Sequence, residues 1–407
     1  MRKRFYKIFT SFCALNFAFL ITTAQTGAWI QKANFAGGPR GYGVAAVVNG
    51  KAYCGLGYDG TNVKNDWWEY DPIGDNWTQK TSCPGNCLYS ATAFTIGNKI
   101  YVGTGDNSGF VSQKEFWQYN PANDTWIRKT DFPDTARYGA SGFSTNGKGY
   151  ITCGWDKNNA WRKDLWEYDT LNNSWTQKIK LSGSARNLPY GISSGNSGYL
   201  AFGQDSLNGH DTELWQYFPQ TNTWVQKNNL PAVGRNAPSG FFINGKLYAG
   251  LGQDAGAINH NDFWGFDTLT NSWQQVASYP GGNTNVAISF QINGKGYVSG
   301  GFDNTGAFLN NMWMFDPNGL SVEEINNFDL VQLYPNPVSD KLTIKLSNQK
   351  HIVGISLYNI MGEEIKIVFE KKNLNTYETN VQLLLKGVYT VNIITDTETI
   401  MKKLIKN

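Results

Sequence analysis

Short apolar runs recur along most of the chain, and glycine-rich or polar turns separate them. Runs of this length, bounded by turn residues, predict β-strands. Four runs end in an Asn-Gly pair, which a type I′ hairpin turn favours because both of its central residues have positive φ. These pairs are Asn49-Gly50, Asn146-Gly147, Asn244-Gly245 and Asn293-Gly294. The pattern therefore predicts a chain built from β-hairpins.

Tryptophan marks an internal repeat of 49 residues. A first set keeps this spacing throughout, and a second set follows its members by nine residues. The sixth partner is missing, because position 322 is Val322, and Trp29 near the N-terminus replaces it. The first set is Trp68, Trp117, Trp166, Trp215, Trp264 and Trp313, and the second is Trp77, Trp126, Trp175, Trp224 and Trp273. We expect four strands in each unit, with the tryptophans packed between units.

The repeat resembles those of kelch β-propellers over residues 28–317. A glycine pair after the second strand, then a Tyr or Phe with a Trp seven residues later, carries the resemblance, as in Tyr70 and Trp77. Only Gly300-Gly301 keeps the adjacent glycines of the family. Five complete units and a sixth completed by Trp29–Lys32 predict an all-β fold. Its main part is a six-bladed kelch-type β-propeller closed by the N-terminal strand, and a small Ig-like β-sandwich follows.

Both ends of the chain differ from the repeat. Residues 1–24 combine a basic start, an apolar run and small residues before Gln25, which predicts a cleaved signal peptide. The propeller is expected at residues 25–317 and a polar linker at 318–330. In residues 331–407, alternation of Leu342, Ile344 and Leu346 predicts half-buried strands of the β-sandwich.

The C-terminal region resembles the type A sorting domain of the type IX secretion system. The residues that carry this resemblance are Tyr334, Pro335, Asn336, Pro337, Gly362, Gly387, Lys402 and Lys403. The resemblance implies the type IX secretion machinery as a partner and export across the outer membrane of a Gram-negative bacterium. The protein is then either secreted or attached to the outer-membrane surface. An ordinary Ig-like accessory domain is the alternative.

Composition narrows the functions available to the folded part. Charged residues make up 16% of the chain, and residues 25–317 hold 21 Lys and Arg against 22 Asp and Glu. This near neutrality argues against nucleic acid as a partner. We expect no transmembrane segment in the mature chain. Cys83 and Cys87 flank a Pro-Gly turn and predict either a small disulfide ring or two free thiols, while Cys54 and Cys153 are expected to be buried.

Four arginines recur just before the first strand of their units, at Arg40, Arg137, Arg186 and Arg235. One hypothesis places them around the mouth of a central channel, where guanidinium groups would bind an anionic ligand. In the other, each arginine pairs with an aspartate that follows the second strand of a repeat. Those aspartates are Asp59, Asp106, Asp156, Asp205, Asp254 and Asp303.

Two tryptophans outside the repeat, Trp155 and Trp161, lie in one loop and are candidates for stacking on a sugar or for burial under that loop. The loop histidines His210 and His260 lack the further ligands of a metal site, so neither metal nor cofactor is predicted. No catalytic motif identifies an enzyme. Two hypotheses stay open: a binding protein whose propeller face recognises a glycan or a protein, and an epimerase or mutarotase acting on acidic sugars.

Overall fold

The computed structural model describes residues 26–86, 88–205, 209–320, 331–346, 352–360, 362–373, 375–395 and 399–407. The predicted signal peptide, Cys87 and most of the predicted linker lie outside these residues. The chain divides into two compact units, Met1–Ser321 and Val322–Asn407. Strands and turns make up the described residues, among which there is no helix, so the fold is all-β.

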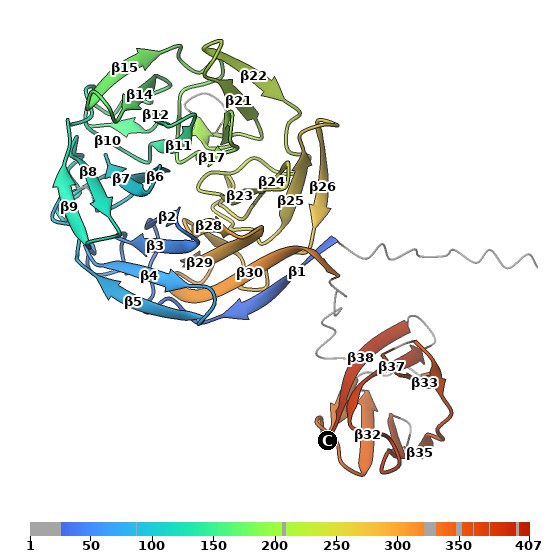
Figure 1. Ribbon diagram of the computed structural model, residues 1–407. Coiled ribbons are helices and arrows are strands. Elements are labelled where there is room, and N and C mark those ends of the chain that lie inside the picture. The colour runs from blue at the N-terminus through green and yellow to red at the C-terminus, as the bar shows by residue number, and fades with distance from the viewer. Residues whose placement is uncertain are drawn as a thin grey trace, which may run out of the picture. The chain divides into compact units, whose positions relative to one another are not determined.

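The first unit is a succession of four-stranded antiparallel sheets arranged around a common axis, a β-propeller-like fold (Figure 1). We number the repeats by their sheets. Repeat one holds β2 (Val44–Val48), β3 (Lys51–Gly55), β4 (Trp67–Asp71) and β5 (Asn76–Lys80). Repeat two holds β6 (Thr92–Ile96), β7 (Lys99–Gly103), β8 (Phe116–Asn120) and β9 (Thr125–Arg128). Repeat three holds β11 (Ser141–Thr145), β12 (Lys148–Thr152), β14 (Leu165–Asp169) and β15 (Ser174–Lys178).

The remaining repeats follow the same order. Repeat four holds β17 (Tyr190–Ser193), β18 (Gly198–Ala201), β21 (Leu214–Phe218) and β22 (Thr223–Lys227). Repeat five holds β23 (Ser239–Ile243), β24 (Lys246–Gly250), β25 (Phe263–Asp267) and β26 (Ser272–Val276). Repeat six holds β28 (Ile288–Ile292), β29 (Lys295–Asp303), β30 (Phe308–Leu320) and β1 (Thr26–Lys32). Short strands between them are β10 (Arg137–Tyr138), β13 (Trp155–Asp156), β16 (Arg186–Asn187), β19 (Gln204–Asp205), β20 (Gly209–His210) and β27 (Thr284–Asn285).

The N-terminal strand β1 pairs with β30 in the register that the tryptophan spacing predicts. Trp29 lies opposite Phe315, as Trp77 lies opposite Tyr70 in repeat one. The pairing reaches Leu320, so β30 extends beyond the boundary expected at Pro317. Repeat six is thus assembled from both ends of the unit.

Two belts of hydrogen bonds join neighbouring repeats. In the inner belt, one backbone N–H before each first strand donates to the equivalent carbonyl of the adjacent repeat over 2.9–3.2 Å. The six residues of this cycle are Tyr42, Ser90, Gly139, Leu188, Ala237 and Val286. In the outer belt, the indole N–H of each tryptophan in the second set, and of Trp29, donates to a carbonyl of the adjacent repeat. Packing of the second set between units is therefore confirmed.

The Asn-Gly hairpins have the backbone that their turn type needs. Asn49 has φ 52° and Gly50 has φ 73°, and the other three pairs are similar. Positive φ at both positions matches the right-handed twist of the strands that the turn joins. These turns close the end of each sheet that is opposite to the start of its first strand.

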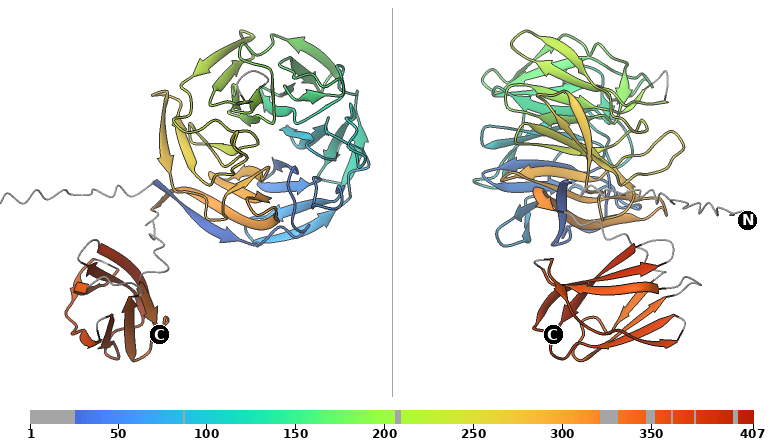
Figure 2. Two further views of the ribbon diagram at one scale, coloured as in Figure 1. Left: turned by 180° about the vertical axis from the view of Figure 1, so that it is seen from behind. Right: turned by 90° about the vertical axis from the view of Figure 1, so that its right-hand side faces the viewer.

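The second unit consists of two four-stranded antiparallel sheets with an apolar core between them, visible edge-on in Figure 2. Leu342, Ile344 and Leu346 are buried in this core, as their alternation predicts. One sheet holds β31 (Val331–Tyr334), β32 (Lys341–Leu346), β36 (Thr376–Asn380) and β35 (Glu370–Asn373). The other holds β34 (Glu364–Ile365), β33 (Ile352–Tyr358), β37 (Gly387–Thr395) and β38 (Thr399–Lys406).

No helix in the described part of the chain has the length and apolar character needed to cross a membrane. Cys54 and Cys153 are fully buried, as predicted, and burial raises the pKa of the Cys153 thiol to about 11. Cys83 is also buried. Its pairing with Cys87 stays a prediction, because Cys87 lies outside the described residues.

Candidate functional site

The four predicted ligand-binding arginines lie inside the fold. Arg40, Arg137, Arg186 and Arg235 are each 0% exposed. Arg40, Arg137 and Arg235 each make two parallel hydrogen bonds to one carboxylate of their own repeat, at 2.5–3.1 Å. The partners are Asp66, Asp164 and Asp262. Bidentate pairing to a buried carboxylate fixes a guanidinium group in place, so these arginines connect strands within their sheets and do not line a channel mouth.

The pairing with the loop aspartates was also wrong, and the true partners follow a different rule. They lie two residues before a tryptophan of the first set, at Asp66, Asp164, Glu213 and Asp262. Except for Asp106, the loop aspartates instead accept backbone N–H groups of their own loops, as Asp303 does from Thr305 and Ala307. The 49-residue spacing of the true partners is visible in the sequence, so this signal was available.

Each of these carboxylates has a second donor, the indole N–H of the tryptophan two residues later. Trp68, for example, donates to Asp66 over 2.7 Å. In repeat five, burial raises the pKa of Asp262, but Arg235 outweighs it, and the pKa lies below its ordinary value. In repeat three burial prevails, and the pKa of Asp164 is raised. Arginine, acid and tryptophan thus form a structural triad in which the arginine is buried and the acid is partly buried.

The end of the propeller where the first strands begin carries a second set of repeated positions. In each repeat, a residue just before the first strand forms an antiparallel β-bridge with a residue just after the second strand. That second residue forms another β-bridge with a third residue in the following loop. We call these sets the mouth triples. In order of repeat they are Gly41–Tyr58–Val63, Tyr89–Asp106–Ser112, Tyr138–Trp155–Trp161, Asn187–Gln204–His210, Asn236–Gln253–Asn259 and Asn285–Phe302–Phe308.

The mouth triples differ from repeat to repeat, whereas the triads and the tryptophans stay nearly constant. Repeat three has three aromatic residues, repeat six has two, and repeats one and two have one each, whereas amides dominate in repeats four and five. Positions that vary on a constant scaffold carry no shared folding role, and loop ends on a rigid scaffold are the usual place for recognition. The mouth triples therefore form the candidate functional site.

Trp155 and Trp161 belong to one mouth triple, so both predicted tryptophans reach the candidate site. Their ring centroids are 4.9 Å apart, and both side chains are half-buried. Tyr138 stacks against Trp155 with an interplanar angle of 12°. The pair is therefore neither free nor sealed under its loop, and it presents an aromatic surface.

A second aromatic group spans repeats six, one and two. Tyr58 contacts both Tyr89 and Phe308, with ring centroids 6.1 Å and 5.6 Å apart, and Tyr42 lies 4.5 Å from Tyr89. Together they line an open cavity of about 550 Å³. Cavities of this size are within the range that accommodates small ligands. Sequence reasoning missed this group, because no single loop contains it.

Asp106 is the one carboxylate in the mouth triples. In the neighbouring repeats the equivalent residues are Tyr58 and Trp155, so Asp106 is not one of the loop aspartates. The loop-aspartate position of repeat two is the next residue, Asn107. Burial raises the pKa of Asp106, and the hydroxyl of Ser112 donates to its Oδ1 over 2.8 Å. Within the described residues, no Lys or Arg side chain pairs with it.

The axis of the propeller holds two cavities lined by the first strands of all six repeats. They measure about 140 Å³ at the mouth end and about 250 Å³ beyond it. Tyr190 lines both, and its hydroxyl bonds to Ser289 on a strand two repeats away. Tyr42 lines the cavity at the mouth end and the aromatic cavity, so the two adjoin.

The histidines form no metal cluster among the residues that the structure describes. His260 Nε2 lies 2.9 Å from Asp254 Oδ2, and burial lowers the pKa of His210. Neither observation identifies a catalytic group.

The sorting-motif residues of the second unit connect its entry to its last strand. Asn336 donates to the carbonyl of Lys403 and accepts from the N–H of Ile405, each over 2.8 Å. Pro335 and Pro337 follow cis peptide bonds, and Lys402 is half-buried in β38. Gly362, with φ 80°, and Gly387 lie in or beside the turns at the same end of the sandwich as Asn336. Tyr334 is 44% exposed.

Comparison with known proteins supports both units. Residues 332–407 match the family described as "Secretion system C-terminal sorting domain". A curated relative, N-acetylneuraminate epimerase of Pasteurella multocida (strain Pm70), is 39% identical over 85 residues, which are 19% of this chain and 22% of that protein. The chain thus matches less than a quarter of that relative's length.

Among solved structures, the fold is similar to that described as "Structure of YjhT", with a TM-score of 0.61 and 17% identity. The similarity covers 70% of this chain and 96% of that one, and it supports the β-propeller-like fold. The sorting domain implies export to the cell surface or the medium. Residues 332–407 therefore carry a secretion-system C-terminal sorting domain, behind a unit with a β-propeller-like fold.

Proposed function

We propose that this chain is an exported carbohydrate-binding protein whose ligand occupies the mouth triples. In this proposal, the first unit is a six-bladed kelch-type β-propeller closed by β1. The two hydrogen-bond belts and the register of Trp29 support that architecture. The type IX machinery recognises the second unit, and the predicted signal peptide directs the chain to it.

The aromatic surfaces of the mouth triples carry the proposal. Trp155 with Trp161, and Tyr58 with Phe308, give half-buried rings on the same end of the propeller. Aromatic faces bury the apolar C–H surface of a sugar, while their polar tips stay hydrated. The amides of repeats four and five, such as Gln204 and Gln253, supply donors and acceptors for sugar hydroxyls.

The alternative proposal is an epimerase or mutarotase that acts on an acidic sugar. Similarity to N-acetylneuraminate epimerase favours it. The geometry favours it less, because the mouth triples contain no Lys or Arg and the repeated arginines are occupied by Asp66, Asp164, Glu213 and Asp262. An acidic sugar in this site would lose water without gaining a cationic partner.

A glycan array probed with the mature chain, residues 25–407, tests the binding proposal. We expect binding to neutral or basic glycans, and at least a tenfold loss in Trp155→Ala/Trp161→Ala. Leu171→Ala is the matched control, because Leu171 is 89% exposed in a turn at the opposite end of repeat three. Selective binding of acidic glycans, together with a change in the anomer ratio of N-acetylneuraminate followed by NMR, would favour the enzyme instead.

A further inference from the structure

The carboxylate of Asp106 is the unusual feature of the mouth. It is 4% exposed and has one hydroxyl donor, Ser112. Asp156, a carboxylate that is equally buried, has Arg162 and two backbone N–H donors. A buried carboxylate without a cation is costly, because it has given up water for little in return.

Two tyrosines neighbour this carboxylate, and a third contacts one of them. Tyr89 is the cross-strand partner of Asp106, and Tyr138 is the equivalent residue of the next repeat. Burial and then Asp106 raise the pKa of Tyr138, which places the phenol within the field of the carboxylate. The Tyr42 ring contacts the Tyr89 ring, with centroids 4.5 Å apart and planes tilted by 34°. All three rings are half-buried, so they border both the protein and the mouth.

Aromatic rings grouped around one carboxylate are suited to a cation. The faces of tyrosine rings attract an ammonium group, and a carboxylate adds a direct charge-assisted hydrogen bond. The described mouth triples hold no basic side chain apart from the imidazole of His210, so the cation has to come from the ligand.

We propose that Asp106, with Tyr42, Tyr89 and Tyr138, binds the protonated amine of an amino sugar. This inference rests on the proposed carbohydrate function and names its ligand class. The sugar ring lies on the aromatic surface beside this group, and its ammonium group faces Asp106. A protonated amine gives the carboxylate the counterion that the protein does not supply. An N-acetylated sugar lacks that charge and gains no such contact.

The sequence itself offers a matched test variant. Asn107 follows Asp106, and aspartate occupies the position of Asn107 in the other five repeats, where it caps the loop. The exchange Asp106→Asn/Asn107→Asp therefore keeps the composition and net charge while moving the carboxylate out of the mouth. Its melting temperature is expected to stay within a few degrees of the wild type, since Asn107→Asp restores the common loop cap.

The experiment is calorimetry on the mature chain at pH 6 with two β-1,4 tetramers, one of glucosamine and one of N-acetylglucosamine. The wild type is expected to bind the glucosamine tetramer at least tenfold more tightly, and the exchange variant is expected to lose that preference. Equal binding of the two tetramers, including no binding of either, overturns the inference. A preference that survives in the folded exchange variant overturns the role of Asp106.

Two further outcomes separate this inference from the proposal beneath it. Tetralysine that competes more strongly than the glucosamine tetramer would assign the site to protein amines and overturn the sugar. Binding of other neutral glycans on the array, lost in Trp155→Ala/Trp161→Ala, would leave the carbohydrate function standing even where the amine preference fails.

Discussion

Repeats with a buried arginine differ instructively from the two repeats that lack one. Repeats one, three, four and five carry the arginine, its carboxylate and the tryptophan that shares it. In repeat six all the charge is absent, since Thr284 replaces the arginine and Asn311 replaces the acid. Both members of the ion pair have been replaced together. An arginine or a carboxylate left alone at such a position would be an uncompensated buried charge.

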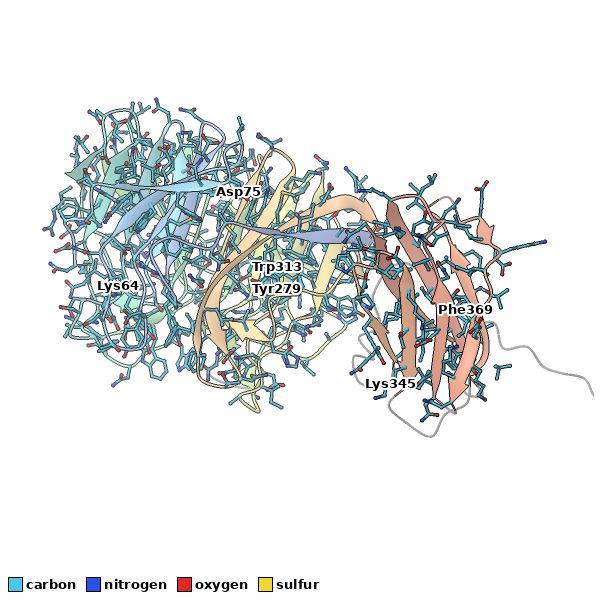
Figure 3. All side chains as sticks on the ribbon, turned by 90° about the horizontal axis from the view of Figure 1, so that it is seen from below. Lys64, Asp75, Tyr279, Trp313, Lys345 and Phe369 are labelled. Carbon is cyan, nitrogen blue, oxygen red and sulfur yellow. The ribbon has the colours of Figure 1, made fainter. Side chains whose placement is uncertain are left out.

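Repeat six also fills the vacant volume. A Cβ added to Gly37 of repeat one would lie 2.7 Å from Arg40 Nη2, and one added to Gly281 would lie 2.6 Å from the hydroxyl of Tyr279. The Tyr279 hydroxyl thus takes the place of a guanidinium group. Tyr279 and Trp313 belong to one core cluster and are labelled in Figure 3. The indole N–H of Trp313 has no partner in the described residues, because Asn311 does not accept from it.

Repeat two lacks the arginine but keeps the acid. The acid is Glu115, and Leu88 stands where the arginine is elsewhere. The carboxylate accepts from the backbone N–H and the side-chain amide of Asn86 over 2.8 Å and 3.0 Å, and from Trp117 over 3.0 Å. N–H donors thus replace the bidentate arginine, and Arg128 adds a longer ion pair to Glu115 at 3.7 Å. The three arrangements show that the fold accepts a bidentate arginine, several N–H donors or an uncharged set of side chains at this position.

The largest effect is expected from Arg137→Met. This change leaves Asp164 and Asp134 without their shared guanidinium group, which bonds to both at 2.6–3.0 Å. Breaking a buried pair by removing one partner costs about 3–5 kcal/mol. Urea unfolding followed by tryptophan fluorescence measures it, and every tryptophan lies before residue 318, so the signal reports on the propeller alone.

The control for this change also removes the charge of the bidentate partner and leaves only Asp134, whose side chain is 27% exposed. Arg137→Met/Asp164→Asn is expected to recover at least half of the lost free energy of unfolding. A single variant that loses less than about 1 kcal/mol would contradict the ion-pair account.

The next effect comes from rebuilding the ion pair in repeat six. Tyr279→Phe/Thr284→Arg places an arginine beside neutral Asn311 and is expected to destabilise the propeller by about 2–4 kcal/mol. Adding Asn311→Asp supplies the carboxylate, with Trp313 as its second donor, and should return stability to within about 1 kcal/mol of the wild type. A double-mutant cycle over positions 284 and 311 measures the coupling. No coupling would mean that the two repeats are not interchangeable.

Much of this architecture could be predicted from the sequence, and the failures have physical reasons. The strands, the repeat and the place of Trp29 follow from tryptophan spacing, because packing between repeats needs the same large residue at each site. Ion pairing of the arginines was one of two hypotheses, but their partners were wrongly assigned, since the pairing depends on a carboxylate 26 or 27 residues later. The aromatic group around Tyr58 was missed because its members come from three repeats and meet only in the folded ring.

A smaller, pH-dependent effect is expected at Asp211 in repeat four. Burial raises its pKa to about 6, although Arg186 lies 3.1 Å away and opposes the shift. A carboxylate whose folded pKa exceeds its unfolded value weakens the fold as it ionises, so stability falls as pH rises from about 4 through about 6. Asp211→Asn removes this loss. Relative to the wild type, the variant should gain about 1–2 kcal/mol between pH 4.5 and pH 7 in urea unfolding. A difference independent of pH would contradict the shift.

The smallest effect is expected from Glu115→Gln in repeat two. Burial acts to raise the pKa of Glu115, but the Asn86 donors outweigh it, and the pKa lies below its ordinary value. Gln keeps one acceptor oxygen for Trp117 and the Asn86 N–H, and it loses the second acceptor for the Asn86 amide and the ion pair with Arg128, a cost of about 1 kcal/mol. The corresponding change in repeat three, Asp164→Gln, would leave buried Arg137 with Asp134 alone in place of its bidentate partner and should cost several times more in the same urea experiment. Equal losses in the two repeats would mean that Asn86 does not substitute for arginine. If only the repeat-three variant loses the larger free energy of unfolding, the destabilisation comes from the arginine that has lost its bidentate partner and not from the loss of the acid itself.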